Sequence, residues 1–207
     1  MAQILLRTVI SYLVGSFPTA YIFGKLLKGV DIRRVGSGNV GATNAFRVLG
    51  KGPGIAVLCI DILKGFIAVV FLGNSSGQLD TVISPQLLGI ILGLACIIGH
   101  NWPVFLRFKG GKGVATTLGV LLALACTIAS LKIILLSLFL TWSAVFLFFR
   151  IVSLASIVTA IMLPVYAYVF KQPAPIITVS ILLALLSIAR HHSNISKLLQ
   201  GKEQRLF

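Results

Sequence analysis

The chain has 207 residues, of which 57% are hydrophobic and only 11% are charged, and its mean hydropathy is +1.04. A soluble domain carries about 25% charged residues, so this composition excludes a soluble globule and predicts an all-α integral membrane protein. Eighteen Lys and Arg residues face four acidic ones, for a net charge of +14. In a soluble protein this excess would suggest nucleic acid, but cytoplasmic loops of membrane proteins collect Lys and Arg. We therefore expect no nucleic-acid partner.

The acidic residues and cysteines also limit the chemistry. Four scattered acids cannot form the carboxylate cluster that binds Mg²⁺ in metal-dependent lipid phosphotransferases. The three cysteines lie inside apolar segments without CxxC spacing, which indicates neither a disulfide nor a metal site. We expect no metal and no cofactor. The N-terminal apolar segment lacks a following small-residue cleavage site, so we interpret it as a retained span.

Apolar stretches long enough to cross a bilayer recur along the chain. One of them, 114–149, is too long for one span, and we divide it at Ser130–Lys132. The last stretch is short, and the turn at Arg150 is tight. The prediction is a single membrane domain, 1–207, with seven transmembrane helices: 4–27, 53–73, 85–105, two within 114–149, 151–170 and 174–189.

The positive charges between these spans are distributed unevenly. Fourteen of the eighteen follow the first, third, fifth and seventh spans, whereas Arg7, Lys132 and Lys171 lie on the other side and Lys64 lies within a span. Because positively charged loops stay in the cytoplasm, the N-terminus should be outside and the C-terminus cytoplasmic, with Asp80 outside. The polar segments predicted to carry the function at the cytoplasmic face are 28–52, 99–117 and 190–200.

The first polar segment contains GSGNVGATN at 36–44, followed by Arg47. Spaced glycines let backbone N–H groups turn toward one point, and arginine offers a planar fork for phosphate. The pattern is neither a Walker loop nor a Rossmann fingerprint. The alternative is a flexible glycine-rich loop, although flexible linkers favour Ser, Glu and Lys over regular spacing. Ser37, Asn39, Thr43 and Asn44 add uncharged hydroxyl and amide donors, so these residues and Arg47 are the candidates for anion binding.

The second polar segment contains KGGKG at 109–113, directly before a predicted span. Two ammonium groups and three glycine amides at a helix N-terminus form a ready anion site. The alternative is a positively charged cytoplasmic loop with glycines for a tight turn. The candidate ligands are Lys109, Gly110, Gly111, Lys112 and Gly113.

The third segment, RHHSN at 190–194, follows the last span. Its histidines could act as acid, base or phosphate donor. Alternatively, the segment begins an amphipathic tail that lies on anionic lipid, and both interpretations can hold together.

Two charged residues lie inside a predicted span, where charges are usually functional or paired. Asp61 and Lys64 are three residues apart, so they share one helix face and can neutralise each other. They could also only fix a helix near the site. His100 ends the third predicted span and can reach the cytoplasmic cluster.

Four stretches, in order, resemble the bacterial acyl-phosphate:glycerol-3-phosphate acyltransferase family, known as PlsY: GSGNVGATN, DILKG, GHNWPVFLRFKGGKGVATTLG, and RHHSNISKLL with GKEQR. The likeness covers almost the whole chain. It implies a seven-helix enzyme of the bacterial inner membrane that moves a fatty acyl group from acyl phosphate to the 1-hydroxyl of glycerol 3-phosphate. Lysophosphatidic acid and phosphate are the products, in the first step of phospholipid synthesis. The implied partners are both substrates, the lipid bilayer and the enzyme that forms acyl phosphate.

The resemblance also implies residue roles. Ser37, Lys112 and His191 would be catalytic. Neither His100 nor His191 begins a His-x4-Asp pair, which excludes the His-Asp mechanism. The resemblance implies instead that a substrate phosphate oxygen takes the hydroxyl proton. His192 leaves open which histidine points inward, and we prefer His191. Glycerol 3-phosphate would be held by Ser37, Asn39, Thr43, Arg47 and Asn194, and acyl phosphate by Lys109, Gly110, Gly111, Lys112 and Gly113, with support from Asn44, Asp61, Lys64 and His100.

Three other functions fit part of the pattern. A transporter for a phosphorylated metabolite would place its site near the midplane within repeated halves, and no such repeat is present. An acyltransferase that uses CoA or carrier protein is a closer rival, because residue types do not reveal the acyl donor. A structural scaffold would not need the KGGKG array.

Overall fold

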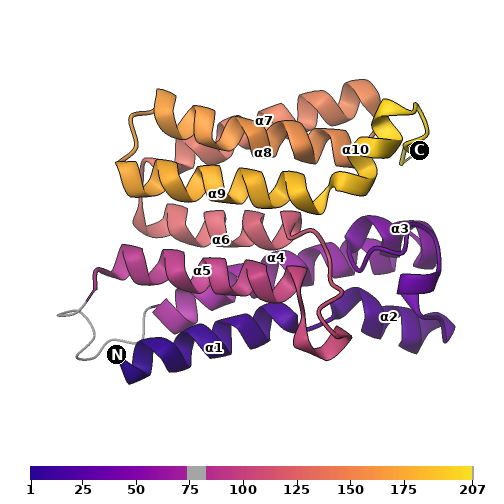
Figure 1. Ribbon diagram of the computed structural model, residues 1–207, viewed down its shortest axis with the longest axis horizontal. Coiled ribbons are helices and arrows are strands. Elements are labelled where there is room, and N and C mark those ends of the chain that lie inside the picture. Colours follow the sequence, from indigo (N-terminus) through magenta and orange to yellow (C-terminus); the bar gives the residue numbers. More distant parts are fainter. Residues whose placement is uncertain (74–82, 207) are drawn as a thin grey trace. The chain divides into compact units, whose positions relative to one another are not determined.

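The computed structural model describes residues 1–73 and 83–206, so the predicted outside position of Asp80 lies beyond the described residues. Every regular element in the described ranges is helical, as the composition predicts (Figure 1). The chain forms two compact units: the first is Met1–Ile128, and the second begins at Ala129.

Among its described residues, the first unit contains six α-helices. It contains α1 (Ala2–Ser16), α2 (Thr19–Lys28), α3 (Ala42–Leu49), α4 (Lys51–Gly73), α5 (Pro85–Asn101) and α6 (Val114–Thr127), with short 3₁₀ turns at Ile32–Arg34 and Val104–Leu106. Helix α4 packs against α5 and α6, and α1 runs along α5 (Figure 1). Glycines permit the close crossing of α4 and α6, since a Cβ at Gly65 or Gly119 would collide with the backbone of the other helix.

Two sequence predictions in this unit are wrong in detail. The first predicted span is not one helix, because α1 ends at Ser16 and α2 begins at Thr19. Pro18 has no N–H and disfavours the helical conformation in Phe17, whose ψ is 116°. In addition, the glycine-rich segment is not only a loop, because its second half folds into α3.

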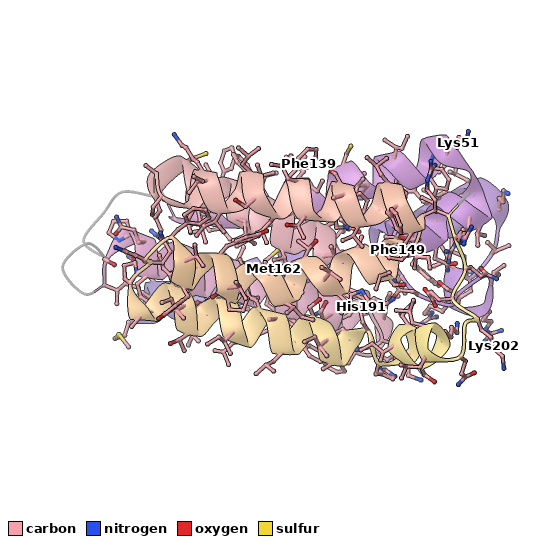
Figure 2. The ribbon with its side chains drawn as sticks, turned by 90° about the horizontal axis from the view of Figure 1, so that it is seen from above. Lys51, Phe139, Phe149, Met162, His191 and Lys202 are labelled. Atoms are coloured by element: carbon pink, nitrogen blue, oxygen red, sulfur yellow. The ribbon has the colours of Figure 1, made fainter. Side chains whose placement is uncertain are left out.

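The second unit contains α7 (Leu131–Phe149), α8 (Val152–Val169), α9 (Ala174–Arg190) and α10 (His192–Leu199). Helix α8 packs against α7 and α9. The division of the long apolar stretch is confirmed, since α6 ends at Thr127 and α7 begins at Leu131. A left-handed Arg150, with φ of 61°, makes the tight turn between α7 and α8. Helices α9 and α10 meet at an angle of 62°, and Figure 2 shows His191 at this junction.

Among the described helices, four are long and apolar enough to cross a membrane by length and composition: α4, α5 with its following turn, α7 and α8. The bent pair of α9 and α10 would make a fifth. Helix α6 is apolar but has only 14 residues, and α1 has 15. The count of seven spans therefore stays a prediction.

Candidate active site

The buried amide of Asn44 gives the first glycine-rich segment a defined shape. Its Oδ1 accepts the N–H of Ser37 at 2.9 Å, and its Nδ2 donates to the carbonyls of Ile32, Val35 and Asn39, each at 3.1 Å. Asn44 is only 1% exposed. The segment is thus organised around one side chain, which speaks against a flexible linker.

The predicted ligands of this segment lie just before α3, at Ser37 and Asn39, and on α3 itself, at Thr43 and Arg47. Ser37 is exposed between two glycines with positive φ, and its Oγ accepts the N–H of Asn39 at 3.5 Å. Thr43 and Arg47 are four residues apart on α3, so they lie on the same face, and both are half-buried. The structure therefore presents a hydroxyl and a guanidinium from one short element.

The second segment ends where α6 begins, as the sequence predicts. Gly113 has a φ of 80° and immediately precedes the first helical residue, Val114. Only Gly113 therefore separates Lys112 from the N–H groups of the first turn of α6. One expectation needs correction: the N–H of Gly111 donates to the carbonyl of His100 at 3.1 Å, so this amide is committed to the shape of the segment.

The two glycine-rich segments meet at Gly111. A Cβ at this position would lie 2.9 Å from the carbonyl oxygen of Val40 and would collide with the imidazole of His100. Both segments also line one cavity of about 10 Å³, enough for about one water molecule. Val40 and Gly111, 71 positions apart in the sequence, thus lie side by side at one cavity.

A buried polar cluster lines the same cavity. Lys64 Nζ lies 2.9 Å from Asp61 Oδ1, which confirms the predicted pairing, and it also donates to the carbonyl of Phe17 at 3.3 Å. Thr19 donates to the same Asp61 oxygen at 3.1 Å, and His100 Nδ1 lies 3.9 Å from it. The break between α1 and α2 supplies two of these partners.

The histidines of the third segment belong to the second unit. His191 is 2% exposed, and its Nδ1 lies 2.8 Å from the carbonyl of Ser187, whereas His192 is exposed. Asn194 donates to Glu203 at 2.6 Å. Sequence reasoning did not single out Glu203, although it is the only glutamate in the chain and lies in a basic tail.

Each described acidic side chain is engaged with neighbouring groups. The side chain and then the backbone N–H of Arg33 lower the pKa of Asp31 to about 2. Asp61 forms an ion pair with Lys64, and Glu203 accepts a hydrogen bond from Asn194. Within the described ranges, no group of three or more His, Cys, Asp or Glu residues could hold a metal ion. The arrangement suits anion binding better than proton abstraction by a carboxylate.

A model of the glycerol-3-phosphate acyltransferase family matches residues 5–201. The chain belongs to this family. Glycerol-3-phosphate acyltransferase 2 of Moorella thermoacetica is 48% identical over 202 residues, covering 98% of this chain and 97% of the relative. The Aquifex aeolicus relative is 43% identical, covering 97% and 98%.

Two solved structures of PlsY, described as an integral membrane glycerol 3-phosphate acyltransferase, share the fold of this acyltransferase. The glycerol 3-phosphate form has a TM-score of 0.83 and 42% identity, and the lysophosphatidic acid form has 0.80 and 41%. Each covers 98% of this chain and 94% of the solved one. The resemblance seen in the motifs is confirmed, and membership of an acyltransferase family favours an enzyme over a transporter or a scaffold.

Proposed function

We propose that this acyltransferase takes its acyl group from acyl phosphate and transfers it to the 1-hydroxyl of glycerol 3-phosphate. The meeting of two cationic, glycine-rich segments at Gly111 and Val40 is the observation that supports this most directly. Both substrates carry a phosphate, and each segment offers the amides and cations that bind one. In acyl phosphate the phosphate is bonded to the reacting acyl carbon, whereas in an acyl thioester that carbon is bonded to sulfur.

The reaction requires little acid–base power from the protein, because acyl phosphate is a mixed anhydride. The substrate hydroxyl oxygen attacks the acyl carbon, and the bond from that carbon to the phosphate oxygen breaks. A phosphate oxygen takes the hydroxyl proton, so lysophosphatidic acid and inorganic phosphate leave. The engaged state of the described carboxylates supports this substrate-assisted route.

The protein's contribution is then to bind and stabilise negative charge. Lys112 and the first turn of α6 would stabilise the charge that grows during transfer. Ser37 and Arg47 would hold glycerol 3-phosphate on the opposite segment. His191 and Asn194 keep the roles that the resemblance implies, and the burial of His191 supports preferring it over the exposed His192.

We also propose that the chain spans the bacterial inner membrane seven times, with its N-terminus outside. The charge bias supports this orientation. It would place 28–52, 99–117 and 190–200 at the cytoplasmic face, within reach of the enzyme that forms acyl phosphate. Reporter fusions to the two termini test it, and reporter activity on the same side of the membrane would refute an odd number of spans.

Phosphate release from purified protein in detergent tests the donor. We expect release with acyl phosphate and glycerol 3-phosphate, without CoA, carrier protein or added metal. Acyl transfer from acyl-CoA or acyl carrier protein, with none from acyl phosphate, would replace the proposed donor.

A further inference from the structure

The polar cluster that contacts the KGGKG segment, formed by Thr19, Asp61, Lys64 and His100, has a high desolvation cost. Asp61 and Lys64 are 2% and 7% exposed, within a long apolar helix. The attraction between two buried charges only partly offsets the free energy lost when they leave water. Apolar pairs of similar size are therefore often as stable. Thr19 and Lys64 both contact one oxygen of Asp61, Oδ1, and His100 lies near it. The cluster therefore fixes the side chains of Thr19, Lys64 and His100 around Oδ1 of Asp61.

His100 extends from this cluster to the KGGKG segment. Its Nδ1 faces Asp61 at 3.9 Å, and the ring is only 7% exposed. The opposite nitrogen, Nε2, lies against Gly111, where a Cβ would collide with it. The backbone of His100 also accepts the N–H of Gly111 at 3.1 Å. The same residue thus contacts the segment through its side chain and its backbone.

The residues around Gly110 and Gly111 leave no room for a side chain at either position. A Cβ at Gly110 would collide with the carbonyl of His100 and with the ring of Pro103. At Gly111 the carbonyl of Val40 closes the other side. The backbone conformation of 110–113 is therefore restricted by His100, Pro103 and Val40. Because Lys112 belongs to this segment, the same contacts restrict its position.

We propose that His100, oriented by Asp61 and Lys64, is a positioning residue that holds 110–113 in its anion-binding shape. The inference rests on the proposed function for its kinetic consequence, but the shape itself can be measured independently. His100 acts through the segment and does not touch the substrate.

His100→Asn tests the proposal in the full-length protein. Asparagine keeps a polar group near the position of Nδ1 but is too short to support Gly111. In limited digestion with trypsin in detergent, cleavage after Lys109 and Lys112 should accelerate, while cleavage after the exposed Lys25 should not. Unchanged cleavage at 109–112 would overturn the proposal, whichever acyl donor the enzyme uses.

Kinetics give a second readout. The KM for the acyl donor should rise about tenfold, within the roughly hundredfold that a misplacement of about 1 Å can cause, while the KM for glycerol 3-phosphate stays unchanged. An equal change for both substrates would indicate a general structural defect and would refute the assignment. The matched control is Ser11→Ala, which removes a buried hydrogen bond from α1 to Leu92 but touches neither segment.

A double-mutant cycle separates positioning from folding. Gly111→Ala should be severely impaired, because its Cβ collides with His100 Nε2. Combined with His100→Asn, it should be about fivefold more active than the product of the two single effects, since contacting residues couple. Independent, multiplicative effects would contradict the proposal.

If His100→Asn does not fold, Thr19→Val is a milder variant, because it removes only one hydrogen bond to Asp61. It should also accelerate cleavage at 109–112. No acceleration would refute the role of the cluster.

Discussion

Asn44→Ala should release the first glycine-rich segment while leaving most of the fold intact. The amide accepts one N–H and has two N–H donors, which three carbonyls share. At about 1 kcal/mol for each of three net hydrogen bonds, the loss is about 3 kcal/mol, or about a hundredfold in the equilibrium that orders the segment.

Hydrogen exchange measured by mass spectrometry is the direct assay. Amides within 32–41 should exchange about a hundredfold faster in Asn44→Ala, and kcat/KM for glycerol 3-phosphate should fall because Ser37 is no longer held. The matched control is Gln172→Ala, which removes another buried amide, bonded to Ser130 and Phe170 in the second unit.

The control should lower thermal stability but leave exchange at 32–41 and kcat/KM unchanged. Normal exchange and normal kinetics in Asn44→Ala would refute the reasoning, since the segment would then keep its shape without the amide. The same loss of protection in Gln172→Ala would also refute it, because the effect would not be local.

Three further predictions concern charges. Lys112→Ala should lower kcat about 10²–10³-fold in the phosphate-release assay, as expected for the loss of one transition-state donor, with an unchanged melting temperature. Lys64→Met should lower the unfolding free energy by about 3–5 kcal/mol, because it leaves buried Asp61 without its cation; thermal unfolding in detergent measures this. Glu203→Ala should lower it by about 1.5–3 kcal/mol, because it removes a charged acceptor from Asn194, and the same unfolding assay applies.

Each of these has its own check. Lys202→Ala, in the exposed tail, is the control for Lys112, and near-normal turnover in both would remove Lys112 from the proposed site. The double variant Asp61→Asn/Lys64→Met should recover most of the lost stability, and no recovery would show that the pair acts by packing alone. For Glu203, Ser153→Ala removes the other hydrogen bond to the same oxygen and should have a smaller effect in the same direction.

Local information in the sequence determined a large part of this protein. The apolar runs predicted an all-α fold and the positions of α4, α5, α8 and α9, because helix length and hydropathy are properties of neighbouring residues. The weak point of the long apolar run at Ser130–Lys132 was visible for the same reason. The motifs were long enough to indicate the family. The break at Pro18 and the helix α3 were local features too, but hydropathy alone does not report them.

Only the tertiary structure decided how the polar residues are used. The pairing of Asp61 with Lys64 follows from helical spacing, but the partners Thr19 and Phe17 lie more than 40 residues away. No spacing rule predicts that Gly111 meets Val40, or that its N–H is bonded to His100. These contacts depend on the packing of helices that are distant in the sequence. The sequence therefore predicted candidate anion-binding residues, whereas packing determined which residues lie together.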